Sequence, residues 1–275
     1  MSSPKGPPNS GDGSDYFFLR EKSAEERLFS GDGETQLPRL SLHDEVRCVE
    51  YLFKVRTKGF EAKADLWLLP KAQMQSVLSS REILSEEDIR FGETISHEPT
   101  RQRYTAMRIL SRIALSHFSE QQVPVEGWAF RLNSFGKPEV ISPRSDICFN
   151  ISHSEDVSVV ATSDCQSIGV DIEFLSPAGL EELPLHVLSD AEKERLNSLE
   201  GRDKYEAFLD YWTLKEAYAK AEGKGFSLDF EKLEVSLQPL SLSFLSGQAI
   251  NQPLLKTMTL SHHEQYYKIA LCLQD

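Results

Sequence analysis

Several features that mark other protein classes are missing from this 275-residue chain. It has no apolar run of the roughly 20 residues needed to span a bilayer, so no membrane association is expected. The first residues, Met1 to Gly6, lack the apolar core of a secretory signal peptide. The four cysteines are scattered, without the paired spacing of a metal site or a disulfide framework. We therefore expect a cytoplasmic protein with reduced thiols.

Positive charge is also scarce. The chain has 30 Lys and Arg against 43 Asp and Glu, which gives a net charge of −13. General nucleic-acid binding is not expected, because it normally requires a basic surface. An anionic small ligand is still compatible with this composition, because a local cluster of Lys and Arg decides such binding.

The order of apolar and turn-forming residues predicts an α+β protein. Residues 1–45 read as a mostly disordered extension, since the first 15 are rich in Ser, Pro, Gly and Asp. Two successive halves with helices and strands follow, near 46–165 and 166–275, without a letter-by-letter repeat between them. Strands are expected at 48–56, 61–69, 128–131, 148–152, 157–163, 168–173, 233–237, 242–245 and 266–273. Helices are expected at 73–78, from Ser85, at 101–118, from Ser189 and at 204–222.

The most informative stretch ends the helix predicted at 204–222. Glu216 and Lys220 are four residues apart and therefore share one face, one turn after Trp212. Lys215 points about 100° away from Glu216. Gly223 fits a left-handed helix cap. Taken alone, the Glu–Lys pair is usually a solvated surface pair. Its position between a Trp and a Gly-x-Gly break instead indicates a site at a helix end.

Two further segments carry candidate functional groups. Alternate residues of a strand share a face, so Asp171 and Glu173 lie together opposite Val170 and Ile172. Two carboxylates on one face of an otherwise buried strand repel each other, and a hard divalent cation such as Mg²⁺ or Mn²⁺ would relieve that cost. The alternative is a strand end at which both acids reach solvent.

His153 follows a strand, Lys137 lies in a Gly-Lys-Pro turn, and arginines including Arg103 decorate the helix at 101–118. Each has an ordinary alternative: a structural histidine, a turn lysine and a solvated helix face.

Taken together, three motifs resemble the signature set of the 4′-phosphopantetheinyl transferases. They are Phe149-Asn150-Ile151-Ser152-His153-Ser154, Gly169-Val170-Asp171-Ile172-Glu173, and Trp212-x-x-Lys215-Glu216-Ala217-x-x-Lys220-x-x-Gly223-x-Gly225. Their order and spacing match the larger, Sfp-type branch, and the Gly136-Lys137-Pro138 turn matches as well. The resemblance covers roughly residues 61–275. It implies a single-chain pseudo-dimer of two similar α/β halves with the active site between them.

The resemblance also implies the reaction. Such enzymes move the 4′-phosphopantetheine arm of coenzyme A onto a serine hydroxyl of an acyl or peptidyl carrier protein and release adenosine 3′,5′-bisphosphate. Asp171, Glu173 and Glu216 fall on the metal-binding carboxylates of the family. Glu216 and Lys220 are the expected catalytic pair, with Glu216 as a candidate general base. The residues expected to contact coenzyme A are Arg103, Lys137, Ser152, His153, Lys215 and Lys220.

This chain departs from the family pattern in two places. Residues 83–90 offer only Arg90 where the family often carries several basic residues, so the contacts to the 3′-phosphate are left unassigned. The extension at 1–45 has no counterpart.

A carrier protein is the expected partner, and a monomer the expected state. The leucine-rich segment 180–188 is a candidate docking surface, with ordinary core packing as the alternative. Two other functions stay open: a non-catalytic homologue that binds coenzyme A or the carrier, and a metal-dependent phosphohydrolase. The absence of a second acidic or His-rich cluster disfavours a two-metal phosphohydrolase.

Overall fold

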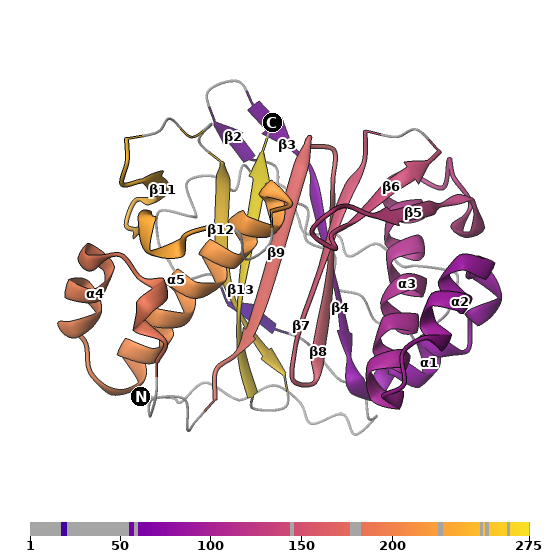
Figure 1. Cartoon of the computed structure of the whole chain (residues 1–275), viewed down its shortest axis with the longest axis horizontal. Helices are drawn as coiled ribbons and strands as arrows, with labels where there is room; N and C mark the ends of the chain where they lie inside the picture. Colours follow the sequence, from indigo (N-terminus) through magenta and orange to yellow (C-terminus); the bar gives the residue numbers. More distant parts are fainter. Residues whose placement is uncertain are drawn as a thin grey trace, which may run out of the picture.

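The computed structural model describes residues 18–20, 55–57, 60–143, 146–176, 183–224, 228–247, 250, 253–262 and 265–274. Within these ranges, helices and antiparallel strands alternate along the chain, which confirms the predicted α+β class (Figure 1). None of the helices in these ranges combines the length and the hydropathy needed to cross a bilayer.

The first half of the described chain ends at β8. Its elements are β2 (Val55–Thr57), β3 (Phe60–Ala62), β4 (Ala64–Pro70), α1 (Met74–Leu78), α2 (Glu86–Glu93), α3 (Glu98–Phe118), β5 (Ala129–Leu132), β6 (Pro138–Ser142), β7 (Cys148–Ser154) and β8 (Val157–Ser163). The second half holds β9 (Ser167–Phe174), α4 (Asp190–Asn197), α5 (Gly201–Glu222), β10 (Leu233–Leu237), β11 (Leu240–Phe244), β12 (Leu254–His262) and β13 (Gln265–Gln274).

The main sheets of the two halves follow the same strand order. In the first half the order is β4–β8–β7, so the first strand lies beside the last. In the second half it is β9–β13–β12, and β1 (Phe18–Arg20) adds to the free side of β12. A β-hairpin, β5–β6 or β10–β11, follows the long helix in each half. The sheets meet where β7 runs beside β9, although these two strands belong to different sheets (Figure 1).

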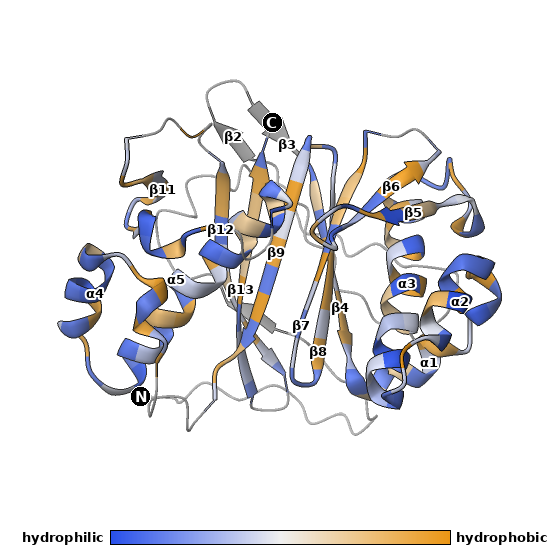
Figure 2. Cartoon of the chain, in the orientation of Figure 1, coloured by the Kyte–Doolittle hydropathy of each residue, from blue (hydrophilic) through white to orange (hydrophobic). Residues whose placement is uncertain are grey.

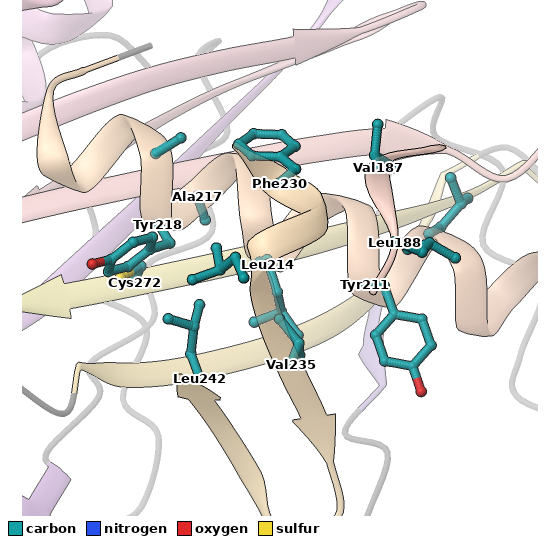
Figure 3. Packing of buried hydrophobic residues seen from close by; sticks show 14 of the residues in the cluster. Val187, Leu188, Tyr211, Leu214, Ala217, Tyr218, Phe230, Val235, Leu242 and Cys272 are labelled. Atoms are coloured by element: carbon teal, nitrogen blue, oxygen red, sulfur yellow. The ribbon is translucent and has the colours of Figure 1, made fainter. Parts of the chain in front are cut away.

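One long helix covers each sheet, α3 the first and α5 the second (Figure 1). Figure 2 shows hydrophobic residues concentrated on the strands, whereas α4 is mostly hydrophilic. In the second half, Leu214 and Ala217 of α5 belong to the same buried cluster as Val235 and Cys272 (Figure 3). Burial of such apolar surface, worth about 25 cal/mol per Å², fixes α5 against the sheet.

A glycine sets the distance between α5 and β9. A Cβ atom placed on Gly169 would lie 1.9 Å from the carbonyl oxygen of Ala217 and 2.5 Å from the amide nitrogen of Ala221. Only glycine therefore allows the helix backbone to rest directly on this strand. The close approach brings the polar residues of α5 next to those of β9.

Most of the predicted elements are present. The strands at 157–163 and 233–237 agree with β8 and β10, and Ser85 and Ser189 cap α2 and α4 as expected. Three of the described strands were missed, β1, β6 and β12. The strand predicted at 48–56 falls mostly outside the described residues, as does the extension at 1–45, of which only Phe18–Arg20 is described.

Candidate active site

The candidate site lies where β7, β9 and α5 meet. Asp171 and Glu173 come from β9, Glu216 and Lys220 from α5, and Ser152 and His153 from β7. Helix α5 ends as predicted, with Gly223 in the left-handed conformation at φ 66°. The site therefore combines strand and helix residues from both halves.

Asp171 is the most tightly held of these groups, with only 4% of the residue exposed. Lys220 Nζ lies 2.6 Å from Asp171 Oδ1 and 2.8 Å from Ser152 Oγ. Ser152 Oγ in turn donates to Asp171 Oδ1 at 2.9 Å. Burial raises the pKa of Asp171, and the ion pair with Lys220 opposes that rise. One buried carboxylate, one ammonium and one hydroxyl thus form a closed triangle.

Glu173 is held at both of its oxygens. Ser154 Oγ donates to Oε2 at 3.0 Å, and Trp212 Nε1 donates to Oε1 at 3.2 Å. Burial and then the charge of Asp171 raise the pKa of Glu173. The indole of Trp212 packs edge-on against Phe230, with the ring centroids 6.0 Å apart. The predicted pairing of Asp171 and Glu173 on one face is therefore present, in a site that is largely shielded from water.

Glu216 is the third carboxylate of the site, and its pKa is also raised. Burial, followed by the charge of Asp171, raises its pKa to about 7. Its Oε1 atom is buried without a hydrogen-bond partner. A carboxylate with a pKa near neutrality is suited to accept a proton under physiological conditions.

The three carboxylates suit a hard divalent cation by their chemistry. Asp171 Oδ2 and Glu216 Oε1 are both buried and without a hydrogen-bond partner, and the donor set consists of oxygen alone. In the part of the chain that the structure describes, however, no three His, Cys, Asp or Glu side chains are gathered closely enough to enclose an ion. The case for a divalent cation at this site therefore depends on the oxygen donors and on the two oxygens without hydrogen-bond partners, because the described residues form no complete coordination shell.

His153 and Arg103 supply positive charge on the side of the first half. His153 is exposed, yet partial desolvation and the charges of Arg103 and Lys220 lower its pKa. Arg103 and Lys220 therefore both lie within electrostatic range of His153.

Lys137 lies at the C-terminal end of α5. Its Nζ donates to the carbonyl oxygens of Ile168 at 3.0 Å and Ala221 at 3.3 Å. Asn133, in the same turn, donates to the carbonyl of Gly223 at 3.2 Å. The turn between β5 and β6 thereby ties the first half to the last turn of α5.

A cavity of about 670 Å³ opens beside this turn. Its walls include Asn133, Lys137, Phe149, Ser167, Glu222 and Gly223. Ala221, the residue after Lys220, also lines the cavity, whereas Asp171, Glu216 and Lys220 do not. Burial lowers the pKa of the Lys137 amine.

Lys215 is the one expected coenzyme A contact that the structure places elsewhere. The residue is fully buried, and its Nζ donates to Glu192 Oε2 at 2.6 Å and to the carbonyl oxygens of Val187 and Phe230. It points away from Glu216 because neighbouring residues of a helix diverge by about 100°. All three ammonium hydrogens are used inside the protein, so we leave Lys215 out of the binding residues.

The structure also locates Arg90 and part of the leucine-rich segment 180–188. Arg90 is exposed on α2, with Nη1 3.8 Å from Glu86 Oε2. In the leucine-rich segment, Leu183 is partly buried against the second-half core and Leu185 is 37% exposed, whereas residues 180–182 lie outside the described ranges. The segment therefore combines core packing with an exposed leucine.

Ser154 and Trp212 belong to the sequence motifs, although the motifs alone indicated no role for either residue. Both hold Glu173, and Asn150 Oδ1 accepts a hydrogen bond from the Val170 amide at 3.0 Å. The alternation of polar residues at 150, 152 and 154 was the available signal, because it places three polar groups on one face of a strand.

Comparison with known proteins identifies the family of the chain. The family model of the 4′-phosphopantetheinyl transferase superfamily matches residues 167–272, which hold β9 and α5. The chain is 34% identical over 180 residues to the 4′-phosphopantetheinyl transferase HetI of Nostoc sp., covering 63% of this chain and 74% of that protein. It is 28% identical over 212 residues to the 4′-phosphopantetheinyl transferase Sfp of Bacillus subtilis, covering 73% of this chain and 91% of that protein.

A mammalian protein is also similar. The L-aminoadipate-semialdehyde dehydrogenase-phosphopantetheinyl transferase of Rattus norvegicus is 26% identical over 187 residues, which cover 64% of this chain and 59% of that protein. The bacterial matches and the family model agree with the family that the sequence motifs predicted. The chain belongs to the 4′-phosphopantetheinyl transferase superfamily.

Proposed function

We propose that this protein transfers the 4′-phosphopantetheine arm of coenzyme A to a serine hydroxyl of an acyl or peptidyl carrier protein and releases adenosine 3′,5′-bisphosphate. The observation that carries the proposal is the meeting of Asp171, Glu216 and Lys220 at the contact between β9 and α5. Phosphoryl transfer requires neutralised phosphate oxygens and a positioned nucleophile, and this group offers both a cation and a base.

A divalent cation, Mg²⁺ or Mn²⁺, would be held by Asp171, Glu173 and Glu216. When bound, it would neutralise phosphate charge. The chain's own residues divide the remaining work. Lys220 binds a phosphate oxygen and stabilises the charge that develops on the leaving side. Glu216, with its pKa near 7, accepts the proton of the serine hydroxyl directly or through water.

The positions and charges of several side chains support the proposed binding of coenzyme A. His153 and Arg103 lie on the first-half side of Lys220, where they would bind phosphate oxygens, and Ser152 positions Lys220. Lys137 lines the cavity of about 670 Å³ next to the last turn of α5, and a space of that size accepts a nucleotide-sized ligand. The chain as a whole carries −13, so this local positive cluster is the feature that selects an anionic co-substrate.

An exposed apolar side chain supports the proposed docking of a carrier protein. Carrier proteins of this kind are usually acidic, so long-range attraction to an acidic enzyme does not drive docking. Leu185, 37% exposed at the edge of the second half, is the proposed apolar contact. In this proposal the enzyme is cytoplasmic. It acts as a monomer, because one chain supplies all of the site residues.

Intact-mass spectrometry tests the proposal. An apo carrier protein incubated with this enzyme, coenzyme A and Mg²⁺ is expected to gain about 340 Da, the mass of one covalently attached phosphopantetheine arm. EDTA is expected to abolish that gain. No gain with fatty-acid, polyketide and peptide carriers, while coenzyme A still binds, would replace the proposal with a non-catalytic binding protein. Coenzyme A hydrolysis without a carrier would indicate a phosphohydrolase.

A further inference from the structure

The contact between the two halves is made by side chains of alternate residues on β7. Asn150 Oδ1 accepts from the Val170 amide at 3.0 Å, Ser152 Oγ donates to Asp171 Oδ1 at 2.9 Å, and Ser154 Oγ donates to Glu173 Oε2 at 3.0 Å. Residues two apart on a strand share a face, so these three groups form a row along β9. We call this row (Asn150, Ser152 and Ser154) the side-chain ladder.

Ser154 occupies the last position of the ladder in a defined orientation. Its hydroxyl oxygen accepts a hydrogen bond from the Phe174 amide at 3.0 Å, so its single hydrogen is directed to Glu173. Trp212 holds the other oxygen of the same carboxylate. The Glu173 side chain is therefore fixed from β7 on one side and from α5 on the other.

Glu173 needs such support because of its neighbour. The charge of Asp171 repels it, and burial opposes its ionised form. Without a donor at Oε2, a half-buried carboxylate would lose a charge-assisted hydrogen bond and would gain by turning towards water. Side chains that orient a carboxylate in this way typically change metal affinity or activity by 10- to 100-fold when they are removed.

We propose that Ser154 is a positioning residue, which holds the Glu173 carboxylate beside Asp171 so that the carboxylate set can receive a divalent cation. This inference rests on the proposed function, because it assigns Ser154 to the same site. Ser154 itself touches neither substrate nor cation in this role.

The test compares Ser154→Ala with Ser154→Thr in the full-length protein. Mn²⁺ alone is titrated by calorimetry, without coenzyme A or carrier. Ser154→Ala is expected to weaken Mn²⁺ binding about tenfold or more. Ser154→Thr keeps a hydroxyl and is expected to restore most of the affinity. In transfer assays, the Mg²⁺ concentration for half-maximal rate should rise in the same order, while the KM for coenzyme A stays unchanged.

Ser163→Ala is the matched control. Ser163 Oγ also donates one bond, to the carbonyl of Lys63 at 2.7 Å, and accepts one, from the Cys165 amide at 3.1 Å. It lies at the far end of β8, so a purely structural loss should change stability in Ser163→Ala and leave Mn²⁺ affinity intact.

Equal Mn²⁺ affinity in wild type and Ser154→Ala would overturn the inference, as would a wild type that binds no Mn²⁺. Weakened Mn²⁺ binding in Ser154→Ala together with no carrier modification by the wild type would support Ser154 and overturn the proposed function instead.

Discussion

The two halves of this protein hold equivalent buried acid–cation pairs, yet only the second half supplies the carboxylates of the candidate site. In the first half Arg112 is fully buried on α3 and pairs with Asp88 of α2. In the second half Lys215 is fully buried on α5 and pairs with Glu192 of α4. Both acids are the third residue of a short helix, and a serine three residues earlier caps that helix. Both cations also donate to backbone carbonyls.

The halves differ around this shared framework. Five residues after the buried cation stand His117 on α3 and Lys220 on α5. His117 Nδ1 lies 3.7 Å from Asp65 Oδ2, as Lys220 lies 2.6 Å from Asp171. By this match Asp65 corresponds to Asp171, and Trp67 stands where the second half has Glu173. The residue after the cation is Ile113 in one half and Glu216 in the other.

The comparison shows that the buried ion pairs hold the helices together in both halves, whereas the candidate site brings together several neighbouring carboxylates. Arg112 and Lys215 are the most deeply buried cations of the described long helices, and each is enclosed by protein acceptors. Buried atoms without a hydrogen-bond partner occur in both halves, at Asp65 Oδ1 and Arg112 Nε in the first and at Asp171 Oδ2 and Glu216 Oε1 in the second. In the second half these atoms belong to two carboxylates that repel each other, and a bound cation would relieve that repulsion.

The largest expected effect comes from Gly169→Ala. The added Cβ would meet the backbone of α5 at 1.9 Å, so the helix must move away from β9. The backbone of α5 cannot shift as a side chain can, so the cost should exceed the roughly 1–3 kcal/mol typical of overpacking, and cooperative folding should be lost. Lys63 takes the corresponding place in the first half, two residues before Asp65, and Lys63→Ala should cost no more than about 1 kcal/mol. Urea denaturation followed by circular dichroism measures both, and equal losses would contradict the comparison.

Next in size are Lys215→Met and Arg112→Met. Each leaves a buried carboxylate without its counter-charge, which should cost roughly 3–5 kcal/mol. Both losses should be similar in urea denaturation, because both cations serve the same framework. Steady-state kinetics at low temperature, on protein that is still folded, should show an unchanged KM for coenzyme A in Lys215→Met. A raised KM without a loss of stability would return Lys215 to the coenzyme A contacts.

A smaller effect concerns the pH dependence of stability, to which Glu216 contributes and its first-half counterpart Ile113 does not. The folded-state pKa of Glu216, about 7, lies above its ordinary value of 4.5, so the folded protein binds this proton more tightly than the unfolded chain. In EDTA, stability should therefore fall as pH rises from 4.5 to 7 and stay low above 7. Lys220 moderates the effect, whereas Asp171 and Glu173 strengthen it.

Glu216→Gln should remove the contribution of Glu216 to this fall of stability with rising pH. At pH 8 in EDTA the variant should be more stable than wild type by up to roughly 3 kcal/mol, since each pKa unit corresponds to about 1.4 kcal/mol. The same variant should not transfer phosphopantetheine. Thermal melts across this pH range provide the measurement, and a variant with the wild-type slope would show that Glu216 is ionised without cost in the folded state.

The smallest expected effect is that of His117→Lys, which gives the first half the cation of the second. A lysine there can pair with Asp65, so stability should stay within about 1 kcal/mol of wild type. Mn²⁺ titration should still give one site per chain, because Trp67 and Ile113 provide no carboxylate. A second site would mean that the acid–cation pair alone is enough to bind a cation.

The half that supplies the carboxylates of the candidate site could be predicted from sequence in detail. Residue alternation in Gly169–Glu173 and the helical spacing of Glu216 and Lys220 placed four side chains correctly, because both patterns are local. The left-handed Gly223 was predicted for the same reason. Strand β12 was missed because its apolar residues are interrupted by Lys256, Thr257, Thr259 and Ser261, and its pairing with β13 is tertiary information.

What could not be predicted depends on long-range partners. The arginines of α3 were left between a solvated face and a ligand site, and Arg112 proves to be neither, because Asp88 and the carbonyl of Trp128 enclose it. Lys215 was assigned to coenzyme A through the family resemblance, and its acceptors, Glu192, Val187 and Phe230, come from three separate segments. No local pattern identifies such acceptors.

The side-chain ladder joins β7 to β9, so the candidate site also lies at the junction of the two sheets. A co-substrate that contacts His153 on one side and Lys220 on the other would bind only while the two sheets remain in register. By thermodynamic linkage, its binding free energy is then added to the association of the halves. The occupied enzyme should therefore resist mechanical separation of its two sheets, so that substrate acts as a clamp between them.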